Sequence, residues 1–243
     1  MSSSRTVLLT GCSSGIGKAI RDTLLAAGYR VLGVARRAEA ETPRGDFVSI
    51  PLDLKELDIL GPQLREAVAP YPQVNAVISN AGVPAFGNLE ELSEKQIREW
   101  MDVNLTSHML VIRTLLPLLK RHATSDVVIM GSEAALRGRK RGSVYCAAKF
   151  GLRGFAQALR EECAASGMRV TLIHPGMVRT PFFTDLDFAP GEAPENAIAP
   201  EDVAQAVALV LAARPGTVFD EIALSPLKKV VHKNLPERGQ TPL

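Results

Sequence analysis

The sequence of 243 residues predicts an α/β protein in which a doubly wound parallel sheet forms a single domain, residues 1–243. Three observations carry this prediction. Short β-branched runs alternate with segments of helical length along the whole chain. Runs such as 127–130 are apolar on both faces, as strands buried between two helix layers are. No repeat and no linker divides the chain, so we expect about seven strands with helices on both faces.

The expected elements follow one another in strict alternation. Strands are predicted at 6–10, 30–35, 47–51, 74–79, 126–131, 169–174 and 219–224. Helices are predicted at 16–27, 55–69, 93–120, 144–166 and 201–213. The last helix carries its apolar residues on one stripe, Val203, Val207, Val210 and Leu211. Gly28 and Gly167 stand between a helical run and a strand, where helix C-terminal caps are expected.

Composition excludes several classes of protein. The 28 Lys and Arg residues nearly balance 26 Asp and Glu, and a net charge of +2 argues against a nucleic-acid partner. The longest apolar run, 206–213, is far shorter than the ~20 residues of a membrane-spanning helix, so no membrane partner is expected. The N-terminus lacks the zones of a signal peptide, and the three cysteines form no Cys-x-x-Cys pair. These features predict a reduced, cytoplasmic protein without a metal site.

A glycine-rich loop joins the first strand to the first helix. Glycine permits a tight turn and lets the backbone approach a pyrophosphate, whose charge is stabilised at a helix N-terminus. The spacing G-x-x-x-G-x-G in this position favours nucleotide binding over a plain strand-to-helix turn. The candidate binding residues of the loop are Gly11, Ser13, Ser14, Gly15, Ile16 and Gly17.

The end of the second strand indicates which nucleotide binds. An acidic residue there would accept hydrogen bonds from the ribose of NAD, but this strand ends in Arg36 and Arg37. A guanidinium group matches a phosphate in charge and geometry. The sequence therefore predicts a preference for NADP(H), mainly through Arg36. The alternative is that both arginines, Arg37 above all, are ordinary solvated loop residues.

A Tyr-x-x-x-Lys pattern, Tyr145 and Lys149, lies near the start of the helix predicted at 144–166. Residues four apart share one helix face, and a nearby ammonium favours the phenolate, which lowers the pKa of the tyrosine toward neutral pH. Ser132 follows an apolar strand at the carboxyl edge of the predicted sheet, and the loop 79–82 follows another. Ligands of open α/β sheets bind at this edge, so the pattern predicts acid–base chemistry there.

The motifs in order resemble those of the short-chain dehydrogenase/reductase family, and the resemblance covers residues 5 to about 225. The motif residues are Thr10-Gly11-x-x-x-Gly15-x-Gly17, Asp53, Asn80-Ala81-Gly82, Asn104, Ser132, Tyr145-x-x-x-Lys149 and Pro175-Gly176. The resemblance implies a Rossmann-type fold with a cofactor half at about 5–125 and a catalytic half at about 126–225, followed by a tail at 226–243. It also implies a homodimer or homotetramer that uses the helices near 93–120 and 144–166 as its interface.

Catalytic roles follow from the same resemblance. Tyr145 would give a proton to a carbonyl oxygen during reduction, and Ser132 would hydrogen-bond that oxygen. Lys149 would lower the pKa of Tyr145 and bind the nicotinamide ribose, while Asn104 would hold a water that links Lys149 to solvent. Alternatively, Asn104 merely caps or kinks its helix. The implied activity is NADP(H)-dependent hydride transfer between nicotinamide and a small-molecule carbonyl compound or alcohol.

The resemblance also assigns cofactor contacts beyond the glycine loop. Asp53 would meet the adenine amino group, although it could equally be the N-cap of the following helix. Val178 and Thr180 would engage the nicotinamide carboxamide. The full set of implied contacts is Asp53, Leu54, Asn80, Ala81, Gly82, Tyr145, Lys149, Pro175, Gly176, Val178 and Thr180.

Substrate and alternatives remain open at this point. The segment 220–226 lacks the glycine-rich ending common in fatty-acid-type reductases, which favours small alcohols, hydroxy acids or sugars. The basic run 137–141 is either a solvated loop or an attractor of anionic substrates. The apolar stretch after Thr180 is either a mobile lid or a fixed loop.

His174 is expected to be a packed strand-end residue, and Cys146 is assigned no role. A non-catalytic NADP(H)-binding regulator or a lyase or epimerase on the same scaffold is the alternative function.

Overall fold

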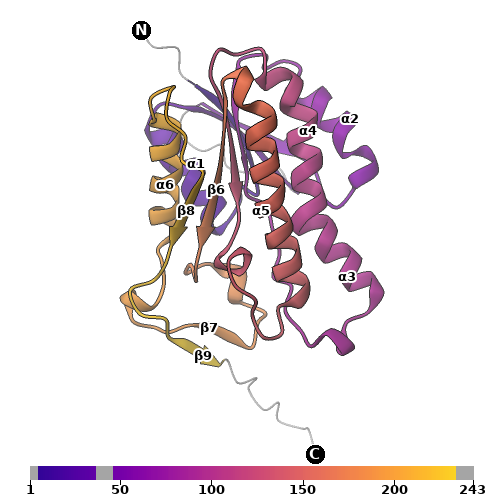
Figure 1. The fold of residues 1–243 in the computed structure, drawn as a ribbon, viewed down its shortest axis with the longest axis vertical. Helices are drawn as coiled ribbons and strands as arrows, with labels where there is room; N and C mark the ends of the chain where they lie inside the picture. The colour runs from indigo at the N-terminus through magenta and orange to yellow at the C-terminus, as the bar shows by residue number, and fades with distance from the viewer. Residues whose placement is uncertain (1–4, 37–45, 234–243) are drawn as a thin grey trace, which may run out of the picture.

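Parallel strands form the centre of the protein, as the computed structural model of residues 5–36 and 46–233 shows (Figure 1). The strands of the main sheet are β1 (Thr6–Thr10), β2 (Arg30–Ala35), β3 (Phe47–Pro51), β4 (Val74–Ser79), β5 (Ser125–Met130), β6 (Met168–Pro175) and β8 (Glu221–Leu224). Their order is β3-β2-β1-β4-β5-β6-β8, and every neighbouring pair is parallel. The doubly wound sheet predicted from the sequence is confirmed.

The strand order reverses between β1 and β4. From β1 the chain adds β2 and β3 on one side, and from β4 onward it adds strands on the other side. The loops that leave β1 and β4 therefore diverge, and a crevice opens between them at the carboxyl edge of the sheet.

Helices cover both faces of the sheet. In Figure 1, α2 (Leu57–Val68), α4 (Ser107–Leu119) and α5 (Ser143–Cys163) lie on one side of the strands. On the other side are α1 (Gly15–Ala26) and α6 (Pro200–Ala212), which pack against each other. Short 3₁₀ turns occupy Leu89–Glu91, Glu133–Ala135, Ala164–Ser166, Pro181–Phe183 and Pro194–Asn196.

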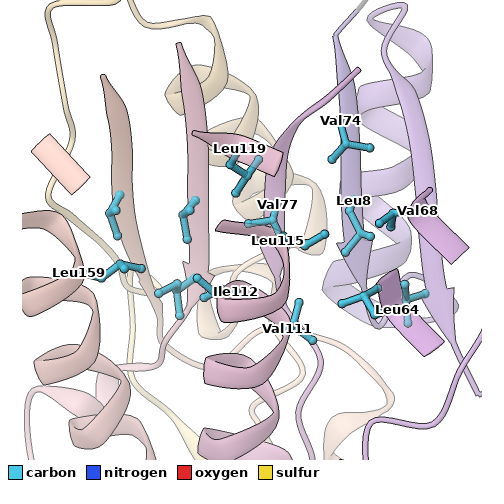
Figure 2. Packing of buried hydrophobic residues seen from close by; sticks show 14 of the residues in the cluster. Leu8, Leu64, Val68, Val74, Val77, Val111, Ile112, Leu115, Leu119 and Leu159 are labelled. Atoms are coloured by element: carbon cyan, nitrogen blue, oxygen red, sulfur yellow. The ribbon is translucent and has the colours of Figure 1, made fainter. Parts of the chain in front are cut away.

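Each face of the sheet has its own apolar core. Figure 2 shows the core between the strands and the α2, α4 and α5 layer, where Leu8 and Val77 of the sheet meet Leu64, Ile112 and Leu115 of the helices. All five side chains are fully buried. Burying a leucine or isoleucine stabilises a fold by roughly 1.5–3 kcal/mol. This packing makes the sheet a rigid base for the loops at its carboxyl edge.

The helix predicted at 93–120 is interrupted in the structure. It consists of α3 (Glu94–Met101), a π-helical segment Asp102–Thr106 and α4. A π turn inserts one residue into the i→i−4 ladder and is found frequently at functional sites. The other predicted elements agree with the structure to within a few residues. Gly28 and Gly167 have φ angles of 82° and 72° at the ends they were expected to cap.

A short antiparallel ribbon lies below the carboxyl edge of the sheet in Figure 1. It pairs β7 (Phe188–Pro190) with β9 (Val231–Lys233), so Phe188 stands opposite Lys233. The apolar stretch after Thr180 is thus held by a strand of the C-terminal segment. The sequence analysis left this stretch open between a lid and a fixed loop, and did not predict the pairing.

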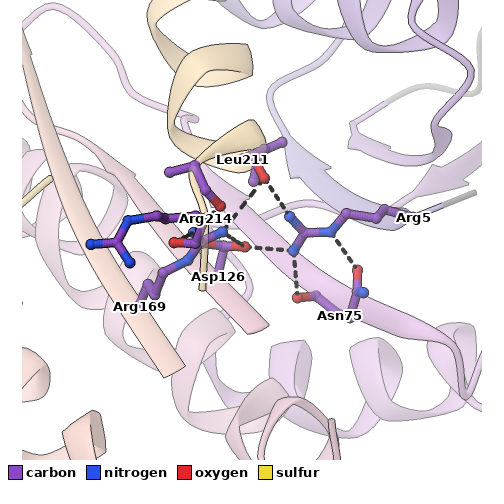
Figure 3. Close-up of polar contacts among 7 residues, drawn as sticks. Arg5, Asn75, Asp126, Arg169, Leu211 and Arg214 are labelled. Carbon is purple, nitrogen blue, oxygen red and sulfur yellow. Dashed lines mark hydrogen bonds and ion pairs between the residues drawn. The ribbon is translucent and has the colours of Figure 1, made fainter. Parts of the chain in front are cut away.

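A buried ion network ties together the amino ends of the strands, as Figure 3 shows. Asp126 of β5 is 1% exposed and receives hydrogen bonds from Arg5 and, at 2.7 and 2.9 Å, from Arg169 of β6. Both arginines also donate to main-chain oxygens at the end of α6, Arg5 to Leu211 at 2.8 Å and Arg169 to Ala213 at 2.6 Å. Cations are favourable at a helix C-terminus, so this network fastens α6 to the sheet.

Within the described ranges 5–36 and 46–233, no helix has both the length and the apolar character that crossing a membrane requires.

Candidate active site

A cavity of about 830 Å³ opens at the carboxyl edge of the sheet. The glycine loop, the ends of β2, β4, β5 and β6, and the first turns of α5 contribute to its wall. Its volume lies within the range of small-molecule and cofactor sites, roughly 300–1,000 Å³. The crevice created by the strand order is therefore also the place where the predicted site residues meet.

The glycine loop forms a bare backbone cradle at the start of α1. Gly11 has a φ of +70°, a region that other residues rarely adopt. A Cβ atom on Gly17 would lie 1.9 Å from the main-chain oxygen of Gly11, so no side chain fits there. The cradle surrounds the N-terminus of α1, whose N-cap is Ser14. Its shape and the free amides of a first helical turn fit a phosphate group.

Thr10 joins the glycine loop to the loop after β4. Its hydroxyl oxygen accepts hydrogen bonds from the main-chain nitrogens of Asn80 and Ala81, at 3.0 and 3.1 Å. The side-chain amide of Asn80 donates in return to the main-chain oxygen of Thr10 at 3.1 Å. These bonds hold the two walls of the crevice at a fixed spacing. The sequence analysis quoted Thr10 as part of a motif but gave it no role.

The far end of the cavity lies beyond the glycine loop. Arg36, Asp53 and Leu54 line it, while Arg37 lies outside the described residues. The Asp53 carboxylate accepts a hydrogen bond from the main-chain nitrogen of Lys55 at 3.0 Å. The N-cap of α2 is Glu56, so the expectation that Asp53 caps this helix is wrong. The reason is local, because the chain makes one further turn after Asp53 before the helix begins.

Ser132 stands directly after β5 at the opposite end of the cavity. It is the N-cap of the 3₁₀ turn Glu133–Ala135, and its hydroxyl oxygen accepts a hydrogen bond from the main-chain nitrogen of Ala134 at 3.1 Å. The hydroxyl proton is thereby left to donate elsewhere. The side chain lines the cavity together with Tyr145.

Tyr145 is 8% exposed and lies on the first turn of α5. Burial raises the pKa of its phenol to about 12, an increase that hydrogen bonding with the Ser132 side chain partly offsets. The expected shift of this pKa toward neutral pH is therefore not found in the protein without a cofactor. The lysine Nζ lies 5.7 Å from the centre of the tyrosine ring, and burial of the phenol is the largest cause of the rise. The phenol is protonated at neutral pH.

Lys149 is one helical turn further on and is 3% exposed. Its Nζ donates a hydrogen bond of 3.0 Å to the main-chain oxygen of Met130, at the end of β5. Burial lowers the pKa of the ammonium to about 8, so it is charged at neutral pH and loses its charge in mildly alkaline solution. His108 nearby bonds Ser79 Oγ at 2.8 Å, and burial lowers its pKa to about 3, so it is neutral.

Asn104 lies in the π-helical segment and is fully buried. Its Oδ1 atom accepts a hydrogen bond of 3.0 Å from the main-chain nitrogen of Val83, and its Nδ2 atom donates one of 3.0 Å to the main-chain oxygen of Trp100. The side chain thus holds the loop after β4 instead of lining the cavity. The alternative that Asn104 marks a kink in its helix agrees with the π turn.

His174, on β6, packs beneath Ser132. Its Nδ1 atom lies 3.1 Å from the main-chain oxygen of Ser132, and its Nε2 atom lies 3.3 Å from Glu221 Oε2. Burial lowers the pKa of this imidazole, while the Ser132 carbonyl and Glu221 act in the opposite direction. The predicted packed strand-end position is what the structure has. Among residues 5–36 and 46–233, no group of three or more His, Cys, Asp or Glu side chains is placed to hold a metal ion.

Aromatic rings form the mouth of the cavity, and some of them belong to the apolar stretch after Thr180 that the sequence analysis considered as a lid or a fixed loop. Phe86 lies 5.1 Å from Tyr145 between ring centres, and Phe182 lies 6.1 Å from it. Phe188 and Val231, from the two strands of the ribbon, also line the cavity. No sequence pattern connects the last two, since 43 positions separate them in the chain.

Two cations of the basic run 137–141 have carboxylate partners at the rim of the cavity. Arg139 pairs with Glu133 at 3.0 Å, and Arg141 pairs with Asp187. Lys140 lines the rim and is exposed. Arg139 and Arg141 of the run considered as an attractor of anionic substrates are thus bound to carboxylates, and Lys140 is not in such a pair with any residue that the structure describes.

The cavity brings together nearly all the residues that the sequence analysis singled out. Those that line it are Gly11, Ser13, Ser14, Gly15, Ile16, Gly17, Arg36, Asp53, Leu54, Asn80, Ala81, Gly82, Ser132, Tyr145, Lys149, Pro175, Gly176, Val178 and Thr180. Asn104 lies behind the wall, and Arg37 is outside the described residues.

Comparison with known proteins adds an independent observation. Residues 5–189, more than half of the chain, match the profile of a family described as short chain dehydrogenase. Sepiapterin reductase from Chlorobaculum tepidum is 27% identical over 235 residues, which cover 90% of this chain and 95% of that protein.

Solved structures agree with this match. An alcohol dehydrogenase from the archaeon Thermococcus sibiricus, complexed with 5-hydroxy-NADP, is 25% identical with a TM-score of 0.82, and the overlap covers 92% of this chain and 97% of that one. A short-chain dehydrogenase from Streptomyces avermitilis is 27% identical with a TM-score of 0.80, covering 93% of this chain and 89% of that one.

Proposed function

The chain belongs to the short-chain dehydrogenase family, and from this premise we propose that it is an NADP(H)-dependent carbonyl reductase or alcohol dehydrogenase with Tyr145 as its acid–base group. One observation carries the proposal. A single cavity has a backbone cradle for phosphate at one end and Ser132, Tyr145 and Lys149 together at the other. That is the arrangement needed to hold a dinucleotide beside a proton donor.

The residues of the cavity fit NADP(H). The cradle at Gly11 and Gly17 would take the pyrophosphate, because it has no side chains there and lies at the N-terminus of α1. Arg36, exposed at the end of β2, would pair with the phosphate on the adenosine ribose. When bound, the nicotinamide would supply or accept the hydride. The alcohol dehydrogenase from Thermococcus sibiricus, whose structure holds an NADP derivative, supports the same cofactor class.

Ser132 and Tyr145 would act on the substrate oxygen. The Ser132 hydroxyl, which bonds the Tyr145 phenol in the protein alone, would donate to the substrate oxygen and hold it near the phenol. Tyr145, protonated because burial raises its pKa, would donate its proton as negative charge develops on that oxygen. In the oxidation direction the same phenol oxygen would take the proton back.

Lys149 would favour this transfer by its charge. Its Nζ lies 5.7 Å from the Tyr145 ring centre, in a site that excludes water and therefore strengthens electrostatic interactions. The positive charge stabilises the phenolate that remains once the proton has left. Asn104 would hold the loop that carries Gly82 and Val83 against the site.

The experiment that tests the proposal follows NADPH absorbance with a panel of ketones and aldehydes and quantifies the alcohol formed. We expect one alcohol for each NADPH consumed. Tight NADPH binding without consumption across the panel would instead favour a regulatory binding protein. The oligomer that the family resemblance implies, a homodimer or homotetramer, is tested separately by light scattering of the purified protein.

A further inference from the structure

The mouth of the cavity is unusually rich in phenylalanine. Four of the eight phenylalanines of the chain, Phe86, Phe182, Phe183 and Phe188, line this cavity. All four are half-buried, so each ring has one part packed and one part facing open space. We propose that this aromatic wall selects carbonyl compounds whose reacting carbon carries a flat aromatic ring, namely aryl ketones and aryl aldehydes. The inference rests on the proposed function and names its substrate class.

The rings are arranged around the proposed proton donor. Phe86 lies 5.1 Å from Tyr145, at an interplanar angle of 37°, and 5.2 Å from Phe188, at 88°. Phe182 lies 6.1 Å from Tyr145 and meets Phe86 at 87°. These separations and the perpendicular contacts are those of favourable aromatic pairs. A ring attached to the reacting carbonyl would enter this set with the same edge-to-face contacts, while its oxygen reaches Ser132 and Tyr145.

The wall is held in place by the C-terminal segment. Phe188 belongs to β7, which pairs with β9, and Val231 of β9 also lines the cavity. The chain that leads to β9 is fastened by Lys229, whose Nζ lies 2.7 Å from Glu133 Oε2 beside Ser132. A wall attached on both strands presents a defined slot to the substrate, and a rigid flat ring loses less conformational entropy in such a slot than a flexible chain does.

The rim of the cavity carries charged side chains, and the aromatic wall does not. Glu133 lies between Arg139, at 3.0 Å, and Lys229, at 2.7 Å, and Arg141 is paired with Asp187. Lys140 is an exposed cation of the same rim. The aromatic rings, by contrast, offer contact area without any polar group that the substrate must satisfy.

The test compares two ketones of equal carbon count, acetophenone and cyclohexyl methyl ketone. Both are assayed with NADPH as substrates of the wild type, Phe182→Leu, Phe188→Leu and the control Phe219→Leu. Phe219 packs against the α6 side of the core, outside the cavity, so its variant has the same chemical change elsewhere. The binding of both ketones to the NADPH complex of Tyr145→Phe is measured through Trp100, the single tryptophan, which packs against the Tyr145 cluster.

We expect the kcat/KM of the wild type to be about tenfold higher for acetophenone than for cyclohexyl methyl ketone. The Tyr145→Phe complex should also bind acetophenone more tightly than the other ketone. The preference should fall to about threefold or less in each cavity variant and stay unchanged in Phe219→Leu. A wild-type ratio near one, or a ratio that survives in both cavity variants, overturns the inference. If a variant fails to fold, the ratio of the wild-type kcat/KM values for the two ketones still tests the inference.

The proposed reductase activity and the aromatic selection are contradicted by different results. Turnover of both ketones at equal efficiency would sink the aromatic selection and leave the proposed reductase intact. Selective binding of acetophenone with no consumption of NADPH by the wild type would contradict the proposed reductase and leave the aromatic selection intact.

Discussion

The imidazole Nδ1 of His174 lies 3.1 Å from the main-chain oxygen of Ser132. A carbonyl oxygen can only accept, so Nδ1 carries the proton and donates it. On the other side of the ring, Glu221 lies 3.3 Å from Nε2 and is itself bound by Arg153 at 2.8 Å. A chain of contacts thus runs from α5 through β8 and β6 to the residue that is proposed to hold the substrate oxygen.

We predict that His174 positions Ser132. Replacing it with leucine removes the donor and should lower kcat by roughly fivefold, which corresponds to a lost hydrogen bond of about 1 kcal/mol. His174→Asn places an amide NH where Nδ1 stood and should recover most of the activity. The dissociation constant for NADPH should change less than twofold in either variant. Equal losses of kcat in both variants would show that the ring merely fills space.

Arg36 provides a test of cofactor preference. Arg36→Leu removes a cation from the end of β2 and should raise KM for NADPH by about tenfold while leaving KM for NADH unchanged. The effect should shrink at high salt because the side chain is exposed. Arg65→Leu, on the exposed side of α2, is the matched control. An equal rise in KM for both cofactors would contradict the assignment of Arg36 to the phosphate.

Lys149 should make the stability of the protein depend on pH. Its folded pKa of about 8 lies below the 10.5 of a free lysine, so between these values the unfolded chain binds more protons and stability rises with pH. Below pH 8 the buried charge destabilises the fold. Lys149→Met should therefore be more stable than the wild type by about 2 kcal/mol at pH 7, with the lost bond to Met130 included.

Urea unfolding of both proteins at pH 7 and pH 10 measures this difference. We expect the advantage of the methionine variant to disappear, or to reverse, at the higher pH. A difference between the two proteins that is the same at both pH values would show that the ammonium is not the group responsible.

A variant of Asp126 should change the stability of the protein without changing its catalytic rate. Asp126→Asn leaves Arg5 and Arg169 without their carboxylate and should lower the free energy of unfolding by about 3 kcal/mol. Asp126 lies near the start of β5, and Ser132 follows the other end of the strand six residues later, a separation of about 20 Å. The kcat of the folded variant, measured well below its unfolding temperature, should therefore match that of the wild type. A fall in kcat with unchanged stability would contradict the structural role assigned to this network.

The strands and the nucleotide loop could be predicted from sequence because their signals are local. Short apolar runs that alternate with segments of helical length predict the strands. Gly11, Gly15 and Gly17 predict a turn that only small residues permit. Residues as distant as Asp53 and Thr180 were assigned to one site by the family resemblance, and they meet because parallel strands place their carboxyl ends at one edge.

Other features depend on contacts that sequence spacing does not reveal. The pairing of Phe188 with Lys233 joins segments far apart in the chain, so the ribbon that holds the apolar stretch after Thr180 had no local signal. The pKa of Tyr145 was predicted with the wrong sign because the pattern shows the cation but not the burial. The hydrogen bond from the main-chain nitrogen of Val83 to Asn104 in the π-helical segment likewise joins residues that no local pattern connects.

The central claim is that the Tyr145 hydroxyl delivers the proton in reduction. The most direct measurement is the single-turnover rate of NADPH oxidation by Tyr145→Phe, saturated with cofactor and given a ketone that the wild type reduces. Loss of one acid–base group predicts a rate at least about 100-fold below the wild type, with NADPH affinity and unfolding temperature preserved. A folded, NADPH-saturated Tyr145→Phe enzyme that reduces the ketone at the wild-type rate would contradict the claim.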